Sequence, residues 1–128
     1  MRTWTADSDA PAAIAWALMA RPGAWSSWAP HVRGAWGLGA PEVRAGARGA
    51  ARLLGVVPVP AKITAKSERS WTWRVGPVEL VHRVVPAAGG SIVTIELRAP
   101  GPLEGALAAA YGPVIQLMLN RLARVAAR

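Results

Sequence analysis

Few side chains in this 128-residue sequence are suited to moving protons, because it contains two histidines, one tyrosine and no cysteine. His82 falls in an alternating segment, 78–85, in which Glu79 and Arg83 mark the polar face. His82 therefore shares the apolar face, which is expected to point into the core. A neutral imidazole there can both donate and accept a hydrogen bond. If the protein is an enzyme, we expect His82 to act as a general base or acid on an enolisable carbonyl. Tyr111 would then stabilise the developing oxyanion.

His82 has a second interpretation that the sequence supports equally. A core histidine that bonds Tyr111 or a Trp N–H would need no ligand. His31 follows Pro30, and we expect it to be a loop or cap residue. Neither histidine has a carboxylate at ligand spacing, so we predict no metal site and no cofactor.

Other catalytic patterns are missing from the sequence. We find no Ser/His/Asp set, no phosphate-binding glycine loop and no dinucleotide fingerprint. Glu79 and Glu96 alternate with apolar residues and are expected on outward faces. The sequence therefore predicts no carboxylate pair for hydrolysis.

Tryptophan supplies most of the aromatic volume, since there are seven Trp, one Tyr and no Phe. Trp71 and Trp73 alternate with polar residues, so both are expected on the inner face, where they pack in the core or stack on a ring-bearing ligand. Trp25 and Trp28 lie three apart in a short predicted helix. One is expected to pack inward and the other to gate the entrance.

The elements that must position these residues follow from hydrophobic periodicity and from Gly and Pro. A strand at 2–6 precedes a helix that ends near Met19 and a short helix at 24–28. Pro102 opens a long amphipathic helix with apolar residues at spacings of three and four. Six further strands with short connections, which favour antiparallel pairing, are expected at 33–38, 47–54, 61–67, 70–75, 78–85 and 91–98.

We therefore expect a single α+β domain over 1–128. Its curved, seven-stranded antiparallel sheet carries two short N-terminal helices and a long C-terminal helix across a cavity. In the strand at 61–67, we expect Ala61, Ile63 and Ala65 to face inward. The candidate ligand-binding residues are Trp28, Trp36, Leu38, Ile63, Trp71, Trp73, Leu80, His82, Val93, Ile95, Leu107, Tyr111, Ile115 and Met118.

Two local stretches resemble a known superfamily. They are residues 22–32, PGAWSSWAPHV, and residues 100–103, PGPL, which lead into the final helix. With the order of elements along the whole chain, they resemble the SRPBCC superfamily of START lipid-transfer, polyketide cyclase/dehydrase-like and birch-pollen-allergen-like proteins. The resemblance implies a helix-grip fold and an apolar ligand such as a lipid, sterol or polyketide. It marks a fold and does not choose a reaction.

The net charge of +8 comes mostly from arginines that are spread from Arg2 to Arg128. A dispersed charge indicates a solvated surface, and no nucleic-acid partner is predicted. Asp7 and Asp9 directly before the apolar run 10–20 argue against a signal peptide. No run reaches ~18 uncharged apolar residues, so we expect no membrane span and a cytoplasmic protein.

Three functions follow from these observations. The favoured one is a binding module for a lipid, polyketide or aromatic metabolite. The second is a cyclase/dehydratase-like enzyme that uses His82 and Tyr111. The third is an interaction module whose basic surface meets an acidic partner such as an acyl carrier protein.

Overall fold

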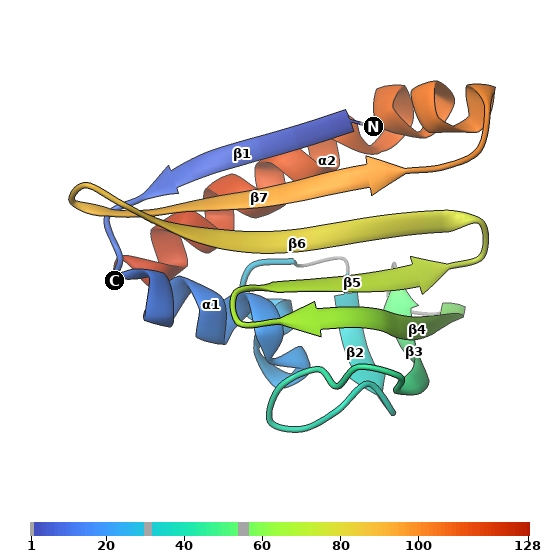
Figure 1. Cartoon of the computed structure of the whole chain (residues 1–128), viewed down its shortest axis with the longest axis horizontal. Helices are drawn as coiled ribbons and strands as arrows, with labels where there is room; N and C mark the ends of the chain where they lie inside the picture. Colours follow the sequence, from blue (N-terminus) through green and yellow to red (C-terminus); the bar gives the residue numbers. More distant parts are fainter. Residues whose placement is uncertain (1, 30–31, 54–56) are drawn as a thin grey trace.

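A single antiparallel sheet organises the molecule (Figure 1). The computed structural model describes residues 2–29, 32–53 and 57–128. The seven strands lie in the order β1-β7-β6-β5-β4-β3-β2. Along the chain the elements are β1 (Arg2–Ser8), α1 (Ala12–Ala20), the 3-10 helix η1 (Pro22–Ser27), β2 (Val32–Trp36), β3 (Arg48–Leu53), β4 (Val57–Ser67), β5 (Ser70–Val75), β6 (Val78–Ala87), β7 (Gly90–Arg98) and α2 (Pro102–Ala126).

The predicted α+β fold is confirmed, with each expected strand and helix present. β4 begins at Val57, four residues earlier than the sequence suggests. Pro58 and Pro60 argue against a strand there, because proline cannot donate to a ladder. Residues 57–60 pair with β3 alone, since pairing with β5 starts at Lys62. The edge of residues 57–60 that is not paired with β3 needs no backbone N–H donor. Both prolines can therefore be accommodated in this part of β4.

A β-bulge lies in β4 between Ile63 and Ala65. Ala65 is exposed, so the expectation that it faces inward is wrong. One extra residue in a strand reverses the alternation of its side chains. Beyond the bulge Lys66 pairs with Trp71 and places its Nζ 3.0 Å from a carboxylate oxygen of Glu42.

The helices cover one face of the sheet. α2 packs mainly on β1 and β7, while α1 packs on β6 and β7 and also contacts α2; Figure 1 shows α2 running behind β1 and β7. The inner face of β7 carries Val93, Ile95 and Leu97, all at most 3% exposed. This confirms the inward side that alternation predicts for β7.

Among the described residues, no helix is both long enough and apolar enough to cross a membrane. The prediction for His31 lies outside the described residues.

Candidate ligand-binding site

Four aromatic rings form one buried cluster on the inner face of the sheet. Trp71 of β5 and His82 of β6 are directly opposed across the two strands, and their rings stack with centroids 3.7 Å apart. Trp25 of η1 also stacks on Trp71, with ring centroids 5.4 Å apart. Trp73 meets Trp25, Trp71 and His82 edge-on at 5.4, 5.9 and 6.1 Å. The cluster thus joins two central strands to the short helix above them.

Local sequence explains how the strands bring these rings together. Gly76, with φ of 59°, and Pro77 form the two-residue connection between β5 and β6. Val75 pairs with Val78 across it. A tight turn fixes the register of a hairpin, so Trp71 must lie opposite His82.

The end of α1 holds Trp25 of η1 and Trp28, which directly follows η1. The indole Nε1 of Trp25 donates to the carbonyl of Met19, and that of Trp28 donates to the carbonyl of Leu18, both at 2.9 Å. The last carbonyls of a helix have no partner within the helix. These two bonds satisfy them and anchor Trp25 over the sheet.

Three other ring nitrogens of the cluster lack hydrogen-bond partners. They are Nε1 of Trp71, Nε1 of Trp73 and Nδ1 of His82. Leaving a buried donor or acceptor unsatisfied costs about 1–3 kcal/mol. Three such atoms therefore lie within one otherwise apolar cluster.

His82 is neutral in this environment. Burial lowers the pKa of His82 from 6.5 to about 3, and backbone hydrogen bonds with Trp71 and Leu80 oppose this only in part. The imidazole therefore offers one donor and one acceptor nitrogen, without charge, near neutral pH.

The remaining predicted residues fall into two groups by burial. Trp28, Leu38, Ile63, Val93, Ile95 and Ile115 are buried in the core, while Leu80, Leu107 and Met118 are only partly buried and pack against it.

Two predicted residues lie elsewhere than expected. Tyr111 is 55% exposed and Trp36 is 49% exposed. The inward placement of Tyr111 is wrong, because α2 rests on β1 with Gly112 against the Trp4 indole. Ile115 then points into the core, and Tyr111 is turned to the neighbouring side of the helix.

That side of α2 carries an apolar stripe, which we define as Leu107, Tyr111, Val114 and Met118. Arg121, seven residues after Val114, shares this side, and its Nε donates to the carbonyl of Ser27 in η1 at 3.1 Å. The stripe therefore lies on the side of α2 that faces η1. Val114 is 39% exposed, so this side is incompletely covered.

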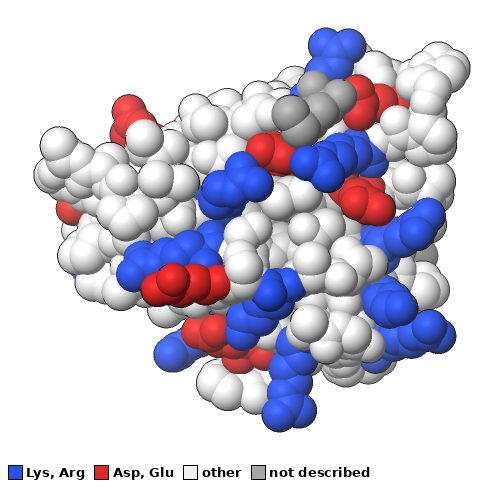
Figure 2. All heavy atoms as spheres, viewed as in Figure 1, with Lys and Arg blue, Asp and Glu red and all other residues white. Residues whose placement is uncertain are grey.

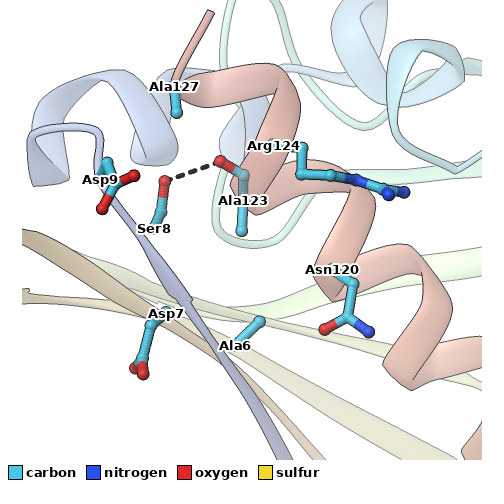
Figure 3. A pocket seen from close by; sticks show the side chains of 8 residues that line it. All are labelled: Ala6, Asp7, Ser8, Asp9, Asn120, Ala123, Arg124 and Ala127. Carbon is cyan, nitrogen blue, oxygen red and sulfur yellow. Dashed lines mark hydrogen bonds between the residues drawn. The ribbon is translucent and has the colours of Figure 1, made fainter.

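Two hollows on the surface contain none of the predicted site residues. One of about 280 Å³ lies between the end of β1 and the C-terminal turns of α2. Figure 3 shows Asp7, Asp9, Asn120 and Arg124 around it, with Ser8 bonded to Ala123. The other, about 430 Å³, includes Arg69 and Arg83. Both have charged linings and do not suit an apolar ligand.

Charge on the outer face of the sheet is balanced locally. Glu96 bonds Arg83 at 2.8 Å and Arg98 at 3.3 Å. The hydrogen bond with Arg83 is the main cause that lowers the pKa of Glu96. Figure 2 shows Lys and Arg interleaved with Asp and Glu over the face turned away from α2.

Residues 3–127 match the family described as polyketide cyclase/dehydrase and lipid transport. The chain belongs to this family. Its membership confirms the resemblance drawn from residues 22–32 and 100–103, and the match extends over nearly the whole chain. No curated protein matches the sequence.

Solved structures share the fold of this polyketide cyclase/dehydrase and lipid transport family member. A START superfamily protein from Mycobacterium smegmatis has a TM-score of 0.69 at 16% identity, over 97% of both chains. A polyketide-cyclase-like protein from Corynebacterium glutamicum has a TM-score of 0.64 at 17% identity, over 97% of this chain and 89% of that one. A protein from Thermobifida fusca reaches 0.76 at 20% identity, over 97% and 91%. At these identities the likeness shows the fold alone.

Sequence reasoning about the site missed two kinds of residue. It selected Trp28 from the short helix, but Trp25 is the one that stacks on Trp71. Both tryptophans have the same neighbours in sequence and both are buried, so no local signal separates them. It also left Val75 and Val78 out of the candidate ligand-binding residues, although alternation with Trp73 and Leu80 puts both on the inner face.

Proposed function

We propose that this protein binds a small hydrophobic molecule on the inner face of the sheet, between η1 and α2. The observation that carries the proposal is incomplete cover at one end of this face. Val75, Val78 and Leu80 share the inner side of β5 and β6 and are only partly buried. Leu80 pairs with Trp73, so the uncovered apolar area adjoins the aromatic cluster. Uncovered apolar area of this kind marks binding surfaces.

The apolar stripe of α2 supplies a second wall. Leu107 and Met118 are partly buried against the core, whereas Tyr111 and Val114 are exposed. An apolar ligand between this stripe and the sheet would remove water from both surfaces. Each Å² of apolar surface so buried contributes about 25 cal/mol.

Binding has more support than catalysis. With the pKa of His82 at about 3, its imidazole is a weak base, and efficient general bases have a pKa near the working pH. Tyr111 is exposed and does not join the buried cluster. A cyclase/dehydratase reaction through these two residues is therefore the second candidate.

An interaction with an acidic protein such as an acyl carrier protein has less support, because the positive charge is dispersed among acidic residues (Figure 2). We place the protein in the cytoplasm, and cell fractionation tests that location.

Displacement of a fluorescent apolar probe tests the proposal. We expect N-phenyl-1-naphthylamine to gain fluorescence on the native protein, and lipids, polyketides or aromatic metabolites to displace it. Leu80→Gln places a polar amide on the inner face and should weaken probe binding at least about tenfold, equivalent to about 1.4 kcal/mol. Native mass spectrometry of freshly purified protein would identify any molecule already bound.

Val85→Gln is the matched control, because Val85 lies on the same strand, on the outer face, at 42% exposure. Probe binding should be unchanged in this variant, and circular dichroism should show that both variants fold. Absence of probe binding, or equal effects of the two substitutions, would contradict the proposal.

A further inference from the structure

The exposed side of α2 is apolar over most of its length. Four of the seven large apolar side chains that the described chain exposes lie there: Leu103, Tyr111, Val114 and Leu117, at 36%, 55%, 39% and 59% exposure. Every other exposed residue of α2 before Leu117 is alanine or proline. The solvent side of a helix normally carries polar and charged residues, so this side has the composition of a contact surface.

The charged residues of α2 lie near its two ends. Arg121 and Arg124 are exposed and follow Leu117 by four and seven residues, so they continue the exposed side. Neither forms an ion pair within the described chain, and Figure 3 shows Arg124 extending away from the acidic residues of the nearby hollow. Glu104, the single acidic residue of α2, is partly buried and accepts a hydrogen bond from the backbone N–H of Ala99 at 3.4 Å. The exposed side therefore changes from apolar to basic without an acidic group.

A bilayer surface with anionic lipids offers a suitable environment to both parts of this side. Leucine and valine side chains can enter the boundary between headgroups and acyl chains, and tyrosine is enriched at that depth. Arginine reaches lipid phosphates from the same level and can bind two phosphate oxygens at once. Each arginine near such a surface adds an attraction that salt screens.

A second copy of this chain fits the exposed side less well. Residues 102–117 of α2 form a strip about 22 Å long and about 10 Å wide. The strip covers roughly 220 Å², against about 800 Å² per partner in a standard protein interface. Two such strips would also place no acidic group opposite Arg121 and Arg124, because the exposed residues before Leu117 are uncharged. Size and charge therefore both favour a lipid surface.

We infer that the exposed side of α2 docks the protein on an anionic lipid surface. The docking residues are Leu103, Tyr111, Val114, Leu117, Arg121 and Arg124. This inference goes beyond the proposed function, because docking requires no ligand inside the fold. Tyr111 and Val114 also belong to the apolar stripe that faces η1, so a docked molecule would bring the proposed ligand site close to the lipid.

Sedimentation with lipid vesicles tests the inference. We expect the native protein to bind vesicles of equimolar phosphatidylglycerol and phosphatidylcholine at least about tenfold more tightly than vesicles of phosphatidylcholine alone, and added salt should reduce this difference. Leu117→Glu places a carboxylate within the apolar part of the exposed side and should weaken binding to the anionic vesicles at least about tenfold. Leu117 is mostly exposed, so the variant should fold, and circular dichroism checks this.

Val85→Glu is the matched control for Leu117→Glu. It adds the same charge at an exposed apolar residue on the outer face of the sheet, and vesicle binding should be nearly unchanged. For the arginines, the double variant Arg121→Gln/Arg124→Gln should lose most of the preference for anionic vesicles. Lys62→Gln/Arg74→Gln removes as many charges from a cross-strand pair of exposed residues on β4 and β5, and the preference should persist.

Paramagnetic broadening gives a second readout that needs no variant. Nanodiscs of the same anionic lipids, containing a lipid with a nitroxide on its headgroup, broaden the NMR signals of protein nuclei close to the membrane. The amide signals of Val114 and Leu117 should lose intensity, whereas that of Val85 should not.

No binding of the native protein to anionic vesicles, or equal binding of Leu117→Glu and Val85→Glu, would overturn the inference. A dimer that forms with rising protein concentration and is abolished by Leu117→Glu would also overturn it and assign the exposed side to a second copy. Binding of N-phenyl-1-naphthylamine decides the proposed function separately. Leu117 lies outside the apolar stripe, so Leu117→Glu should bind the dye as the native protein does.

Discussion

His82 shows how one side chain depends on its burial. It is 5% exposed, stacked on Trp71 at 3.7 Å and opposite Ile95 of β7. No charged group is among the causes that shift its pKa, and burial dominates them. A protonated imidazole at this position would have little to stabilise it.

Stability should therefore fall in acid because of this residue. An unperturbed histidine has a pKa of about 6.5, and burial lowers the pKa of His82 to about 3 in the folded protein. Between these values the unfolded state therefore binds more protons. Stability rises with pH across this window and is lost as the pH falls from 6.5 towards 3. From pH 7 to pH 5 we expect a loss of about 2 kcal/mol, measured by urea unfolding at each pH.

His82→Phe is the control for this pH dependence. The variant keeps a flat ring against Trp71 but cannot titrate, so its stability should decline less between pH 7 and pH 5. Equal declines in the two proteins would assign the acid sensitivity to other groups.

At the scale of elements, the position of α2 depends on a glycine. A Cβ added at Gly112 would lie 3.1 Å from Cζ2 of Trp4, which is closer than ordinary van der Waals contact. At Gly105, the nearest atom to an added Cβ is Nη2 of Arg2 at 3.5 Å. The helix thus approaches β1 closely at one glycine and less closely at the other.

Alanine should have different effects at these two positions. Gly105→Ala should stabilise the protein by about 0.5 kcal/mol, because alanine favours helix. Gly112→Ala should be less stable than Gly105→Ala by about 1 kcal/mol, since the added methyl crowds Trp4. Thermal unfolding of both variants measures the difference, and equal gains would mean that Trp4 does not pack on Gly112.

The hairpin between β6 and β7 provides a second test at this scale. A Cβ on Gly90 would overlap the backbone oxygen of Ser8 in β1. We expect Gly90→Ala to destabilise the protein by more than about 2 kcal/mol, because backbone atoms cannot yield as a side chain can. Gly89, with φ of 79° and open space around it, is the control. Gly89→Asn should be nearly neutral, because asparagine tolerates this conformation.

At the scale of the whole molecule, the excess of positive charge does not make a polyanion site. The chain has 15 Lys and Arg against 7 Asp and Glu, but acidic groups lie among the basic ones on the outer face (Figure 2). Arg83 and Arg98 are partly neutralised by Glu96. Tight binding of DNA would require many unopposed cations along one surface.

We expect only weak, non-specific binding to a short DNA duplex, with Kd no lower than ~10⁻⁵ M at about 0.15 M salt. Fluorescence anisotropy over a range of salt concentrations measures this. Nanomolar binding that persists at about 0.3 M salt would contradict the dispersed-charge interpretation.

The sequence by itself determined the class and order of the elements. Period-two alternation in 70–75, 78–85 and 91–98 places Trp71, His82 and Ile95 on the inner face, because successive side chains of a strand point to opposite sides and the apolar side faces the core. Glycine and proline separate the strands, and the apolar spacing after Pro102 predicts the long helix. These are local properties, so a single sequence is enough to read them.

Only the tertiary structure determined the features that depend on contacts between segments distant in the sequence. The bulge that turns Ala65 outward is a feature of the pairing of β4 with β5. Tyr111 is exposed because the helix packs on Trp4 through Gly112. The choice of Trp25 over Trp28 for stacking depends on where the end of α1 holds each indole. Alternation and periodicity assign a residue to a side of its own element, but its neighbours across the fold decide whether that side is covered.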